Sequence, residues 1–448
     1  MQHRTDYVVA GRHATEDIAV TAHDTGSCAS LLADAEGPVV AQVGSATVPA
    51  LLAAARDRGR SLWLVPRDET SATLDALVAR TQAATVIGEK APEHRITGRA
   101  LVAGRYLYAQ SDHSAPVPRQ ETDEPGVGLV TSGSTGEPRG VWRSWSALLL
   151  EARTVAAELR VGEHGSSVIC AAPLSHAYGL VLGLLAAEVT EARPVLLEQT
   201  MTGTRMLQLA ERYRAGVLVA VPAQYARMRR RSATVVAPEL LAVCVSAGST
   251  LTPQVRDSFA VSFGRAITNH YGTTASGSIA VSPGAATQGC IGSPYRGVDI
   301  ARDDDGQLLV RTPWSADPAR AEPTGDIGSW DGQSWHVSGR TTDQININGR
   351  KTTRARIEAV IATSPQVTDV AVEVLVSSAQ VPLIVAFVAA GNDEAVSGAA
   401  EVCRAQLPPF ARPKRFVRVA SIPRSERGKL LRHRLPPLPD SLQGAAPS

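Results

Sequence analysis

The chain of 448 residues is poor in aromatic residues and lysine, has no long apolar run, and carries charges that nearly cancel. Aromatic residues make up 4%, four lysines stand against 41 arginines, and the formal net charge is +2. So small a net charge argues against a dedicated nucleic-acid binder. The longest apolar stretch, residues 179–189, is too short to span a bilayer. We therefore expect neither nucleic acid nor a membrane among the partners.

Cysteine is also scarce, and no two of the five cysteines have the spacing of a metal-binding pair. This pattern argues against a zinc site and against a disulfide framework. The N-terminal residues lack the apolar segment of a secretory signal peptide. The sequence predicts free thiols, no metal-ligating residues and a cytoplasmic location.

The central part of the chain has an α/β pattern. Between residues 37 and 263, short apolar segments alternate with helical ones, which is typical of parallel sheets covered by helices. We expect helices at 48–58, 73–81, 144–159, 177–188, 203–214, 224–230 and 253–263.

The pattern changes after residue 290. Short alternating segments at 291–335 look antiparallel or barrel-like, with turns at 305–306 and 331–332. A smaller unit follows, with a hairpin near 345–354, helices at 355–362 and 393–406, and two strands between them. We predict an α/β fold in which a large N-terminal domain of layered α/β sheets plus a barrel-like piece, residues 1–340, precedes a small α+β C-terminal domain, residues 341–448.

The strongest local feature is a glycine-rich loop between a predicted strand at 126–132 and a predicted helix. Small residues and hydroxyls let backbone N–H groups converge on phosphate oxygens. The Walker A and GxGxxG spacings are both absent, and a flexible linker is the alternative interpretation. We expect phosphate contacts from Thr131, Ser132, Gly133, Ser134, Thr135, Gly136 and Arg139.

This loop resembles the phosphate-binding signature of adenylate-forming enzymes, a superfamily that includes acyl-CoA synthetases, luciferases and peptide-synthetase adenylation domains. In that family a lysine usually stands where this chain has Arg139, and both side chains offer a cation to pyrophosphate. The resemblance extends over roughly residues 37 to 436 and implies ATP and Mg²⁺ as cofactors. It also implies a mobile C-terminal domain that turns on a hinge near Thr342. The N-terminal region departs from the family in being shorter than in typical members, which we interpret as a trimmed subdomain in an enzyme of specialised metabolism.

Further segments resemble the motifs of this family, in the family's order. His176, in the segment 173–179, resembles the residue that lines the acyl pocket, and Gly248 and Ser249 resemble the turn beside the adenine ring. A tyrosine of the YGxT motif can stack on a purine and a threonine hydroxyl can bind a phosphate oxygen. The matching residues here are Asn269, His270, Tyr271, Gly272, Thr273 and Thr274.

Two motifs lie nearer to the C-terminus. The resemblance implies that Asp326 and Arg340 hold the ribose, since a carboxylate accepts from both hydroxyls. It places Lys429, in the segment 423–432, as the ammonium that bridges the attacking carboxylate and the α-phosphate. The expected catalytic residues are therefore Lys429, Thr274 and His176.

The sequence also departs from the family. Ala275 stands where the family has a glutamate that contributes to the Mg²⁺ environment, and no nearby carboxylate is an obvious replacement. Arg354 and Arg356 replace a proline and a glutamate in a segment near the thioester-forming face. These changes leave the handling of Mg²⁺ and the identity of the acceptor open.

The resemblance implies an ATP-dependent ligase that converts a carboxylic acid, aromatic or short acyl, into an acyl adenylate with release of pyrophosphate. CoA, a carrier-protein thiol or an amine would then take the acyl group. One alternative within the superfamily is a diazotase-type enzyme that activates nitrite for transfer to an arylamine. Another is a nucleotide-binding scaffold with reduced catalysis. The sequence names neither the acid nor the oligomeric state.

Overall fold

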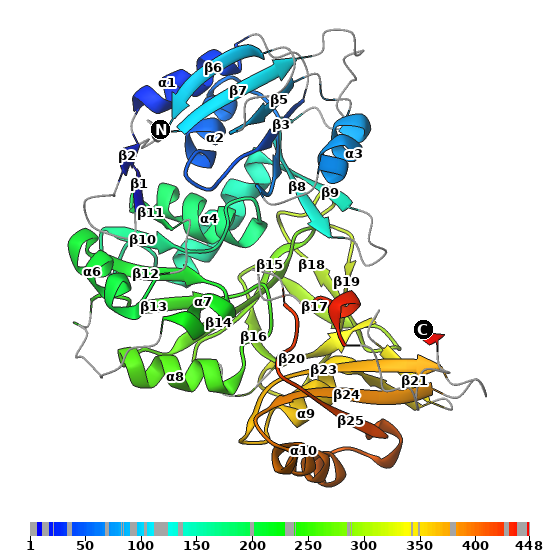
Figure 1. The fold of residues 1–448 in the computed structure, drawn as a ribbon. Helices are drawn as coiled ribbons and strands as arrows, with labels where there is room; N and C mark the ends of the chain where they lie inside the picture. The colour runs from blue at the N-terminus through cyan, green and yellow to red at the C-terminus, as the bar shows by residue number, and fades with distance from the viewer. Residues whose placement is uncertain are drawn as a thin grey trace. The chain divides into compact units, whose positions relative to one another are not determined.

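The computed structural model divides into two compact units (Figure 1). The larger comprises 1–287, 291–300 and 310–322, and the smaller comprises 288–290, 301–309 and 323–448. The residues described are 7–10, 18–20, 22–33, 38–67, 71–81, 83, 85–89, 96–102, 105–111, 124–132, 138–197, 201–228, 237, 239–284, 287, 289–341, 344–347, 350–376, 382–424, 430–436 and 446–447.

The larger unit contains a mainly parallel sheet in the strand order β16-β15-β14-β13-β12-β10-β11-β1-β2. Strands β1 and β10 to β14 run parallel. Strand β2 pairs antiparallel with β1 on one side, and β15 and β16 pair antiparallel on the other. Their continuous runs of β-branched and small apolar residues suit strands that are buried on both faces. Their bounds are β1 Tyr7–Ala10, β2 Ile18–Val20, β10 Ser167–Cys170, β11 Arg193–Leu197, β12 Ala215–Ala220, β13 Val243–Ser246, β14 Ile267–Thr273, β15 Gly277–Ser282 and β16 Cys290–Pro294.

Helices cover both faces of this sheet. Three of them, α6 (Gly203–Tyr213), α7 (Pro222–Arg227) and α8 (Pro253–Phe263), bury apolar residues against alternate residues of β10 to β14, including Ile169, Leu218 and Ile267. Threonines at positions 202 and 252 cap α6 and α8 by accepting from backbone N–H groups three residues on. Helices α4 (Trp145–Glu158) and α5 (Ala186–Val189) contact the π-helix Gly179–Leu185, which also contacts β10 and β12.

A second sheet in the same unit has the order β6-β7-β5-β3-β4-β8-β9. Its central strands β5, β3, β4 and β8 are parallel, and β8 and β9 form an antiparallel hairpin. The bounds are β3 Val39–Gln42, β4 Leu62–Val65, β5 Thr85–Gly88, β6 Ile96–Val102, β7 Arg105–Ser111, β8 Gly126–Ser132 and β9 Pro138–Ser144, with α1 Ala22–Leu31, α2 Val48–Asp57 and α3 Ser71–Thr81.

The smaller unit is α+β. Its sheet has the order β25-β24-β23-β26, and α9 and α10 pack apolar residues such as Ile357, Ile361 and Cys403 on β23 and β24. Strands β17 to β20 precede it, with β21 and β22 as a hairpin. The bounds are β17 Asp299–Arg302, β18 Gln307–Arg311, β19 Glu322–Trp330, β20 Trp335–Arg340, β21 Gln344–Ile347, β22 Arg350–Thr353, α9 Arg354–Ile361, β23 Val367–Val376, β24 Pro382–Ala390, α10 Asp393–Gln406, β25 Arg415–Val419 and β26 Ala446–Pro447, with one-turn 3₁₀ helices at Pro409–Ala411 and Arg432–Arg434.

The structure confirms the predicted α/β fold and most of the predicted helices. The predicted helix at 177–188 is wrong in kind, because residues 179–185 form a π-helix before the short α5. The glycine-rich loop does not lead directly into a helix either, since β9 intervenes and makes it the tip of a hairpin. In the described part of the chain, no helix has the length and apolarity needed to cross a membrane.

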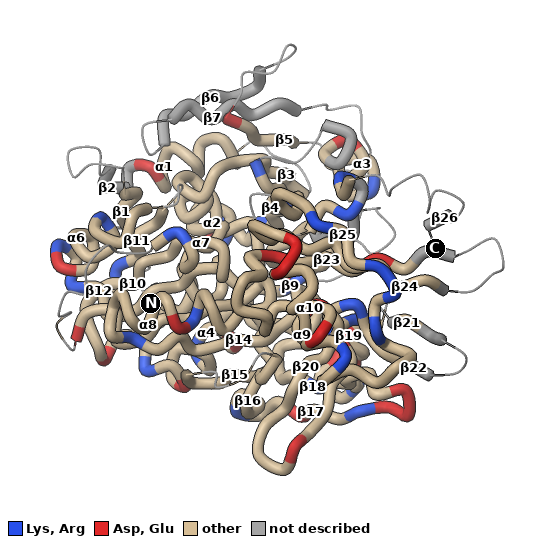
Figure 2. Tube along the Cα trace, turned by 60° about the horizontal axis from the view of Figure 1, so that its bottom comes forward, with Lys and Arg blue, Asp and Glu red and all other residues tan. Residues whose placement is uncertain are grey.

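Lys and Arg, and Asp and Glu, are scattered over the described parts of the chain (Figure 2). All five cysteines are buried free thiols, as the sequence predicts. The expected hinge residue Thr342 lies outside the described residues.

Candidate functional site

Several of the predicted site residues lie at one edge of the parallel sheet in the larger unit. Strands β10, β12, β13 and β14 run parallel, so their carboxyl ends meet at the same edge. The segments that follow β10 and β13 carry His176, Gly248 and Ser249, and β14 itself ends at Thr273. In open α/β sheets ligands bind outside the carboxyl ends of the strands. The fold therefore gathers the predicted acyl-pocket, adenine and YGxT motifs at one ligand-binding edge.

Tyr178 joins the segment 173–179 to this edge. Its hydroxyl donates toward the carbonyl oxygens of Val245 at 2.7 Å and Ala220 at 3.1 Å, at the ends of β13 and β12. Its ring stacks on His270, with the centroids 5.7 Å apart. The segment that carries His176 is thus fixed against the YGxT strand by a residue that the sequence analysis did not select.

His270 is a buried, neutral part of this edge. Its side chain is 6% exposed, and its Nδ1 lies 2.8 Å from the hydroxyl oxygen of Tyr295. Burial lowers the pKa of His270 to about 3 and raises the pKa values of Tyr178 and Tyr295. The three rings form an uncharged aromatic cluster at neutral pH.

The end of β14 has the geometry of a tight, well-held turn. Thr273 accepts at Oγ1 from the backbone N–H of Ser276 at 2.9 Å. Gly277 has φ +71°, and a Cβ there would lie 2.6 Å from the indole Nε1 of Trp314, so only glycine fits. The residues between them, 274–276, form the turn that connects β14 to β15 and that includes the departure at Ala275.

The neighbouring strand ends in a short polar segment. The Oγ of Ser246 is buried and has no hydrogen-bond partner in the described part of the chain. Gly248 follows with φ +87°, a left-handed conformation that favours glycine. Ser246 pairs in register with Asn269, which places the predicted adenine turn beside the YGxT strand.

The glycine-rich loop is carried by the β8–β9 hairpin. Thr131 pairs with Arg139 and Ser132 with Pro138, so the two arms meet directly at the loop. The predicted loop residues Gly133, Ser134, Thr135 and Gly136 lie outside the described residues. Thr131, Ser132 and Arg139 are placed on the hairpin by the backbone alone.

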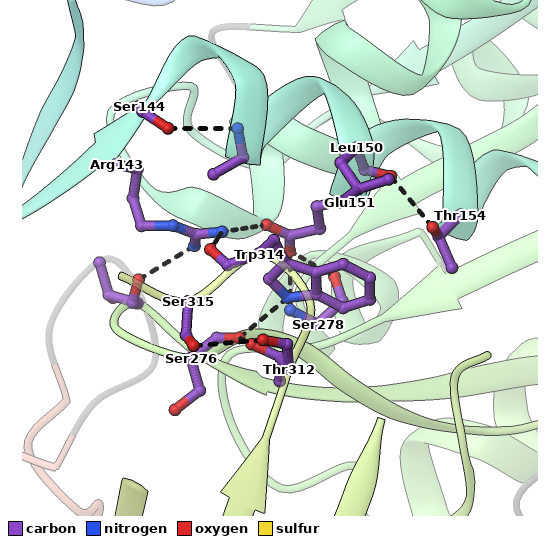
Figure 3. Close-up of polar contacts among 12 residues, drawn as sticks. Arg143, Ser144, Leu150, Glu151, Thr154, Ser276, Ser278, Thr312, Trp314 and Ser315 are labelled. Atoms are coloured by element: carbon purple, nitrogen blue, oxygen red, sulfur yellow. Dashed lines mark hydrogen bonds and ion pairs between the residues drawn. The ribbon is translucent and has the colours of Figure 1, made fainter. Parts of the chain in front are cut away.

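A buried ion pair lies behind this hairpin (Figure 3). Arg143, on β9, donates from Nη2 to Oε2 of Glu151, on α4, at 2.7 Å, and the side chains are 3% and 2% exposed. The other carboxylate oxygen accepts from the backbone N–H and hydroxyl of Ser278 at 2.7 and 2.6 Å. The guanidinium also donates to the carbonyl oxygens of Thr274 at 3.3 Å and Trp314 at 3.4 Å.

In the smaller unit, the structure brings Asp326 and Arg340 together. They are register partners on β19 and β20, and Arg340 Nε donates to Asp326 Oδ1 at 2.7 Å. Asp326 is 7% exposed whereas the Arg340 side chain is 57% exposed. Gly325, at φ +78°, and the Thr324 hydroxyl, which accepts from the Asp326 N–H at 3.1 Å, set the direction of the carboxylate.

Lys429 lies outside the described residues, but both ends of its loop are fixed. Arg424 and Leu430 form a β-bridge, and the N–H of Leu431 donates to the carbonyl oxygen of Pro423 at 2.9 Å. Arg424 forms a bidentate pair with Asp369 of β23. Arg432 pairs with Glu373 and donates to the carbonyl oxygen of Val372 at 2.8 Å. The two described ends of the segment that contains Lys429 are thus both attached to β23.

The described residues offer no protein ligand set for a metal. No group of three or more histidine, cysteine, aspartate or glutamate side chains in the described ranges could hold an ion. Glu151, the carboxylate behind the turn 274–276, is occupied by Arg143 and Ser278. Glu151 therefore does not replace the missing glutamate at position 275 as a Mg²⁺ ligand.

Sequence reasoning missed the residues that connect the motifs: Tyr178, Tyr295, Arg143, Glu151, Ser278 and Trp314. One signal was available for Glu151, because it stands on the apolar face of α4 among Leu148, Ala152 and Val155. A carboxylate at such a position requires a buried partner. Nothing in the local pattern identifies that partner, which is eight residues away on another element.

Comparisons with known proteins agree with this geometry. A family model described as AMP-binding enzyme matches residues 11–316, and one described as AMP-binding enzyme C-terminal domain matches 356–429. A 4-hydroxybenzoate–CoA/benzoate–CoA ligase of Rhodopseudomonas palustris is 31% identical over 274 residues, 54% of this chain and 50% of that protein. A sulfoacetate–CoA ligase of Cupriavidus necator is 27% identical over 361 residues, 73% and 70% of the two chains.

A solved structure has the same fold. The o-succinylbenzoate CoA synthetase of Bacillus subtilis, in complex with AMP, superimposes with a TM-score of 0.76 at 18% identity. The alignment covers 97% of this chain and 96% of that one. The match spans 50% of the length of the first of these curated relatives and 70% of the second.

Proposed function

Because this chain belongs to the family of AMP-binding enzymes, we propose that it is an ATP-dependent ligase that activates a carboxylic acid as its acyl adenylate. A carboxylate oxygen attacks the α-phosphorus of ATP, an acyl–phosphate bond forms, and pyrophosphate leaves. The observation that carries this proposal is the meeting of three nucleotide and acid motifs at the carboxyl edge of β10, β13 and β14.

The site residues divide between binding and charge neutralisation. The glycine-rich loop with Arg139 holds the phosphates, Gly248, Ser249 and the segment 269–273 hold the adenine side, and the Asp326–Arg340 pair holds the ribose. Bringing two anions together is the main barrier, which fixed positive charge and hydrogen-bond donors lower. Lys429 supplies that charge between the two reactants, and Thr274 binds a phosphate oxygen.

Mg²⁺ enters as MgATP, bound to phosphate oxygens and water. Mg²⁺ commonly keeps several waters and binds through substrate phosphates. Because position 275 is an alanine, the turn itself contributes no carboxylate to the surroundings of the ion. Residues 341–448 act as a mobile domain that turns near Thr342 between the two half-reactions.

The acid is aromatic or a short acyl compound. His270, Tyr178 and Tyr295 form a neutral aromatic cluster beside the segment of His176, which suits an uncharged ring better than a second carboxylate. A relative that uses benzoate, by its name, supports the same class. His176 then lines the pocket that takes the acid.

The acceptor is a thiol, with CoA as the first choice because both reported relatives are named as CoA ligases. A carrier-protein thiol or an amine would use the same adenylate. Five buried free cysteines agree with a reducing, cytoplasmic location.

Pyrophosphate release tests this function. The chain is incubated with MgATP, a panel of aromatic and short-chain acids and CoA, and separately with nitrite and an arylamine. We expect release that depends on one acid and a CoA thioester detected by mass. Pyrophosphate release in the incubation with nitrite and an arylamine, and with none of the acids, would establish the diazotase-type alternative instead.

Lys429→Ala separates an enzyme from a scaffold. It should abolish adenylate formation while leaving ATP binding near the wild-type value. Lys414→Ala removes a lysine from the same unit and serves as the matched control. ATP binding by the wild type without turnover on any acid would favour the nucleotide-binding scaffold.

A further inference from the structure

A single buried guanidinium connects the two hairpins that carry the phosphate-side motifs. Arg143 belongs to β9, the arm that leaves the glycine-rich loop, and its Nη1 donates to the carbonyl oxygen of Thr274 at 3.3 Å. Thr274 begins the turn that follows the YGxT strand β14. The two hairpins lie in different sheets, so no ladder of backbone hydrogen bonds sets the distance between them.

The carboxylate of Glu151 completes this connection. It binds Arg143 through Oε2, and through Oε1 it accepts from the N–H and hydroxyl of Ser278, at the start of β15. Figure 3 shows the guanidinium and the carboxylate side by side, with Trp314 and Ser278 around them. The pair therefore contacts the turn 274–276 on both sides, at Thr274 and at Ser278.

Other contacts leave this turn little freedom. The carbonyl oxygen of Ser276 accepts from the Trp314 indole at 2.9 Å and from the Thr312 hydroxyl at 3.0 Å. A Cβ on Gly277 would lie 2.8 Å from Glu151 Oε2, so the carboxylate packs directly against the turn. Among the hydrogen bonds of the turn described above, the one from Arg143 links it to the hairpin of the glycine-rich loop.

Stability alone is a poor reason for this arrangement. Removing two charges from water is costly, and well-packed apolar residues commonly replace a buried ion pair without loss of stability. A planar guanidinium instead offers several donors in a fixed geometry, which suits a connection among three acceptors. The charges of the pair cancel, so it adds no net charge near the turn at Ala275.

We infer that Arg143, oriented by Glu151, is a positioning residue that sets the distance between the glycine-rich loop and the YGxT motif for the attack on ATP. The inference rests on the proposed function. Misplacing catalytic groups by about 1 Å can lower a rate by about a hundredfold. The adenylation half-reaction uses both motifs and therefore depends on this distance. Thioester formation from a supplied acyl adenylate depends on it less, because pyrophosphate no longer takes part.

The double variant Arg143→Met/Glu151→Gln tests this directly. The glutamine oxygen still accepts from Ser278, both charges leave together, and only the contacts of the guanidinium are lost. We expect a melting temperature within about 4 °C of the wild type. We expect kcat for adenylation to fall roughly tenfold to a hundredfold, while the rate from supplied acyl adenylate and CoA changes less than threefold. Equal loss in both half-reactions, or none in adenylation, overturns the inference.

A second set of variants guards against a simple folding defect. Arg143→Lys keeps the charge but not the planar fork, and it should show the same imbalance between the half-reactions. Arg160→Lys makes the same substitution in the exposed Arg160–Glu163 pair and should leave both half-reactions unchanged. An Arg143→Lys enzyme with wild-type kcat in both would contradict the assignment.

Amide hydrogen exchange tests the connection even when no acid is turned over. In the double variant, amides of 138–144 and of 267–282 should lose protection together, whereas those of α10 should not change. Failure of the wild type to turn over any acid would then refute the proposed function alone. Unchanged protection in both segments would refute the positioning role alone.

Discussion

Arg424 and Asp369 form a two-point ion pair, with Nε and Nη2 each 2.7 Å from a different carboxylate oxygen. Asp369 is on β23, and Arg424 is the last described residue before the loop of Lys429. The hydrogen bond to Asp369 raises the pKa of Arg424. The geometry fixes the arm that carries the predicted catalytic lysine.

Asp369→Asn should therefore weaken catalysis without removing the lysine. We expect adenylate formation to fall by about tenfold, with ATP affinity close to wild type, because Lys429 spends less time in the productive position. Single-turnover kinetics and equilibrium ATP binding measure the two effects. Asp393→Asn breaks the exposed Arg418–Asp393 pair of the same unit and should change neither. A matching loss in that control would show that the effect is general.

Asp326→Asn should impair recognition of the ribose. The wild type should use ATP better than 2′-deoxy-ATP, because a carboxylate accepts from the 2′-hydroxyl. We expect the variant to raise KM for ATP by about tenfold and to lose most of this discrimination. Asp331→Asn, in the turn after β19, is the control. Discrimination that survives in Asp326→Asn would rule out the predicted contact.

Gly128→Ala should destabilise the hairpin that carries the glycine-rich loop. A Cβ at Gly128 would lie 2.1 Å from the ring of Trp63, and one at Gly140 would lie 2.5 Å from it. Overpacking of this kind costs about 1–3 kcal/mol, measurable by urea unfolding. Trp63→Val should restore part of the loss in the double variant. Gly391→Ala has open space around it and should cost much less. Stability unchanged in Gly128→Ala would show that the ring moves freely.

His270 should make stability depend on pH. Burial lowers its pKa to about 3, so between that value and the ordinary pKa of about 6.5 the unfolded chain binds the extra proton. The free energy of unfolding should thus rise with pH in this window, by up to about 1.4 kcal/mol per pH unit from this residue. This contribution of His270 to the free energy of unfolding is lost as the pH falls. Urea unfolding at several pH values should give a smaller slope for His270→Asn, and an equal slope would contradict this origin.

The predicted elements agree with the structure where local chemistry decides them. The apolar run of β12 predicts a buried strand, and Pro253 and Gly264 mark the start and end of α8. The prediction of an ordinary helix at 177–188 is wrong for the π-helix Gly179–Leu185, because a π-helix depends on packing against α4 and β10. The sequence does not predict the hairpin arm β9, because Pro138 and Gly140 interrupt its alternation.

The candidate site divides in the same way. The motifs around Tyr271, Asp326 and Lys429 are contiguous in the chain, so the sequence alone identified them and the family. Arg143 and Thr274 are 131 positions apart, and neither local pattern indicates the other. Burial makes such a contact specific, because a charge removed from water is stable only where folding supplies its partner. The sequence thus determined the family and its motifs, whereas tertiary packing alone decided which side chains hold those motifs in place.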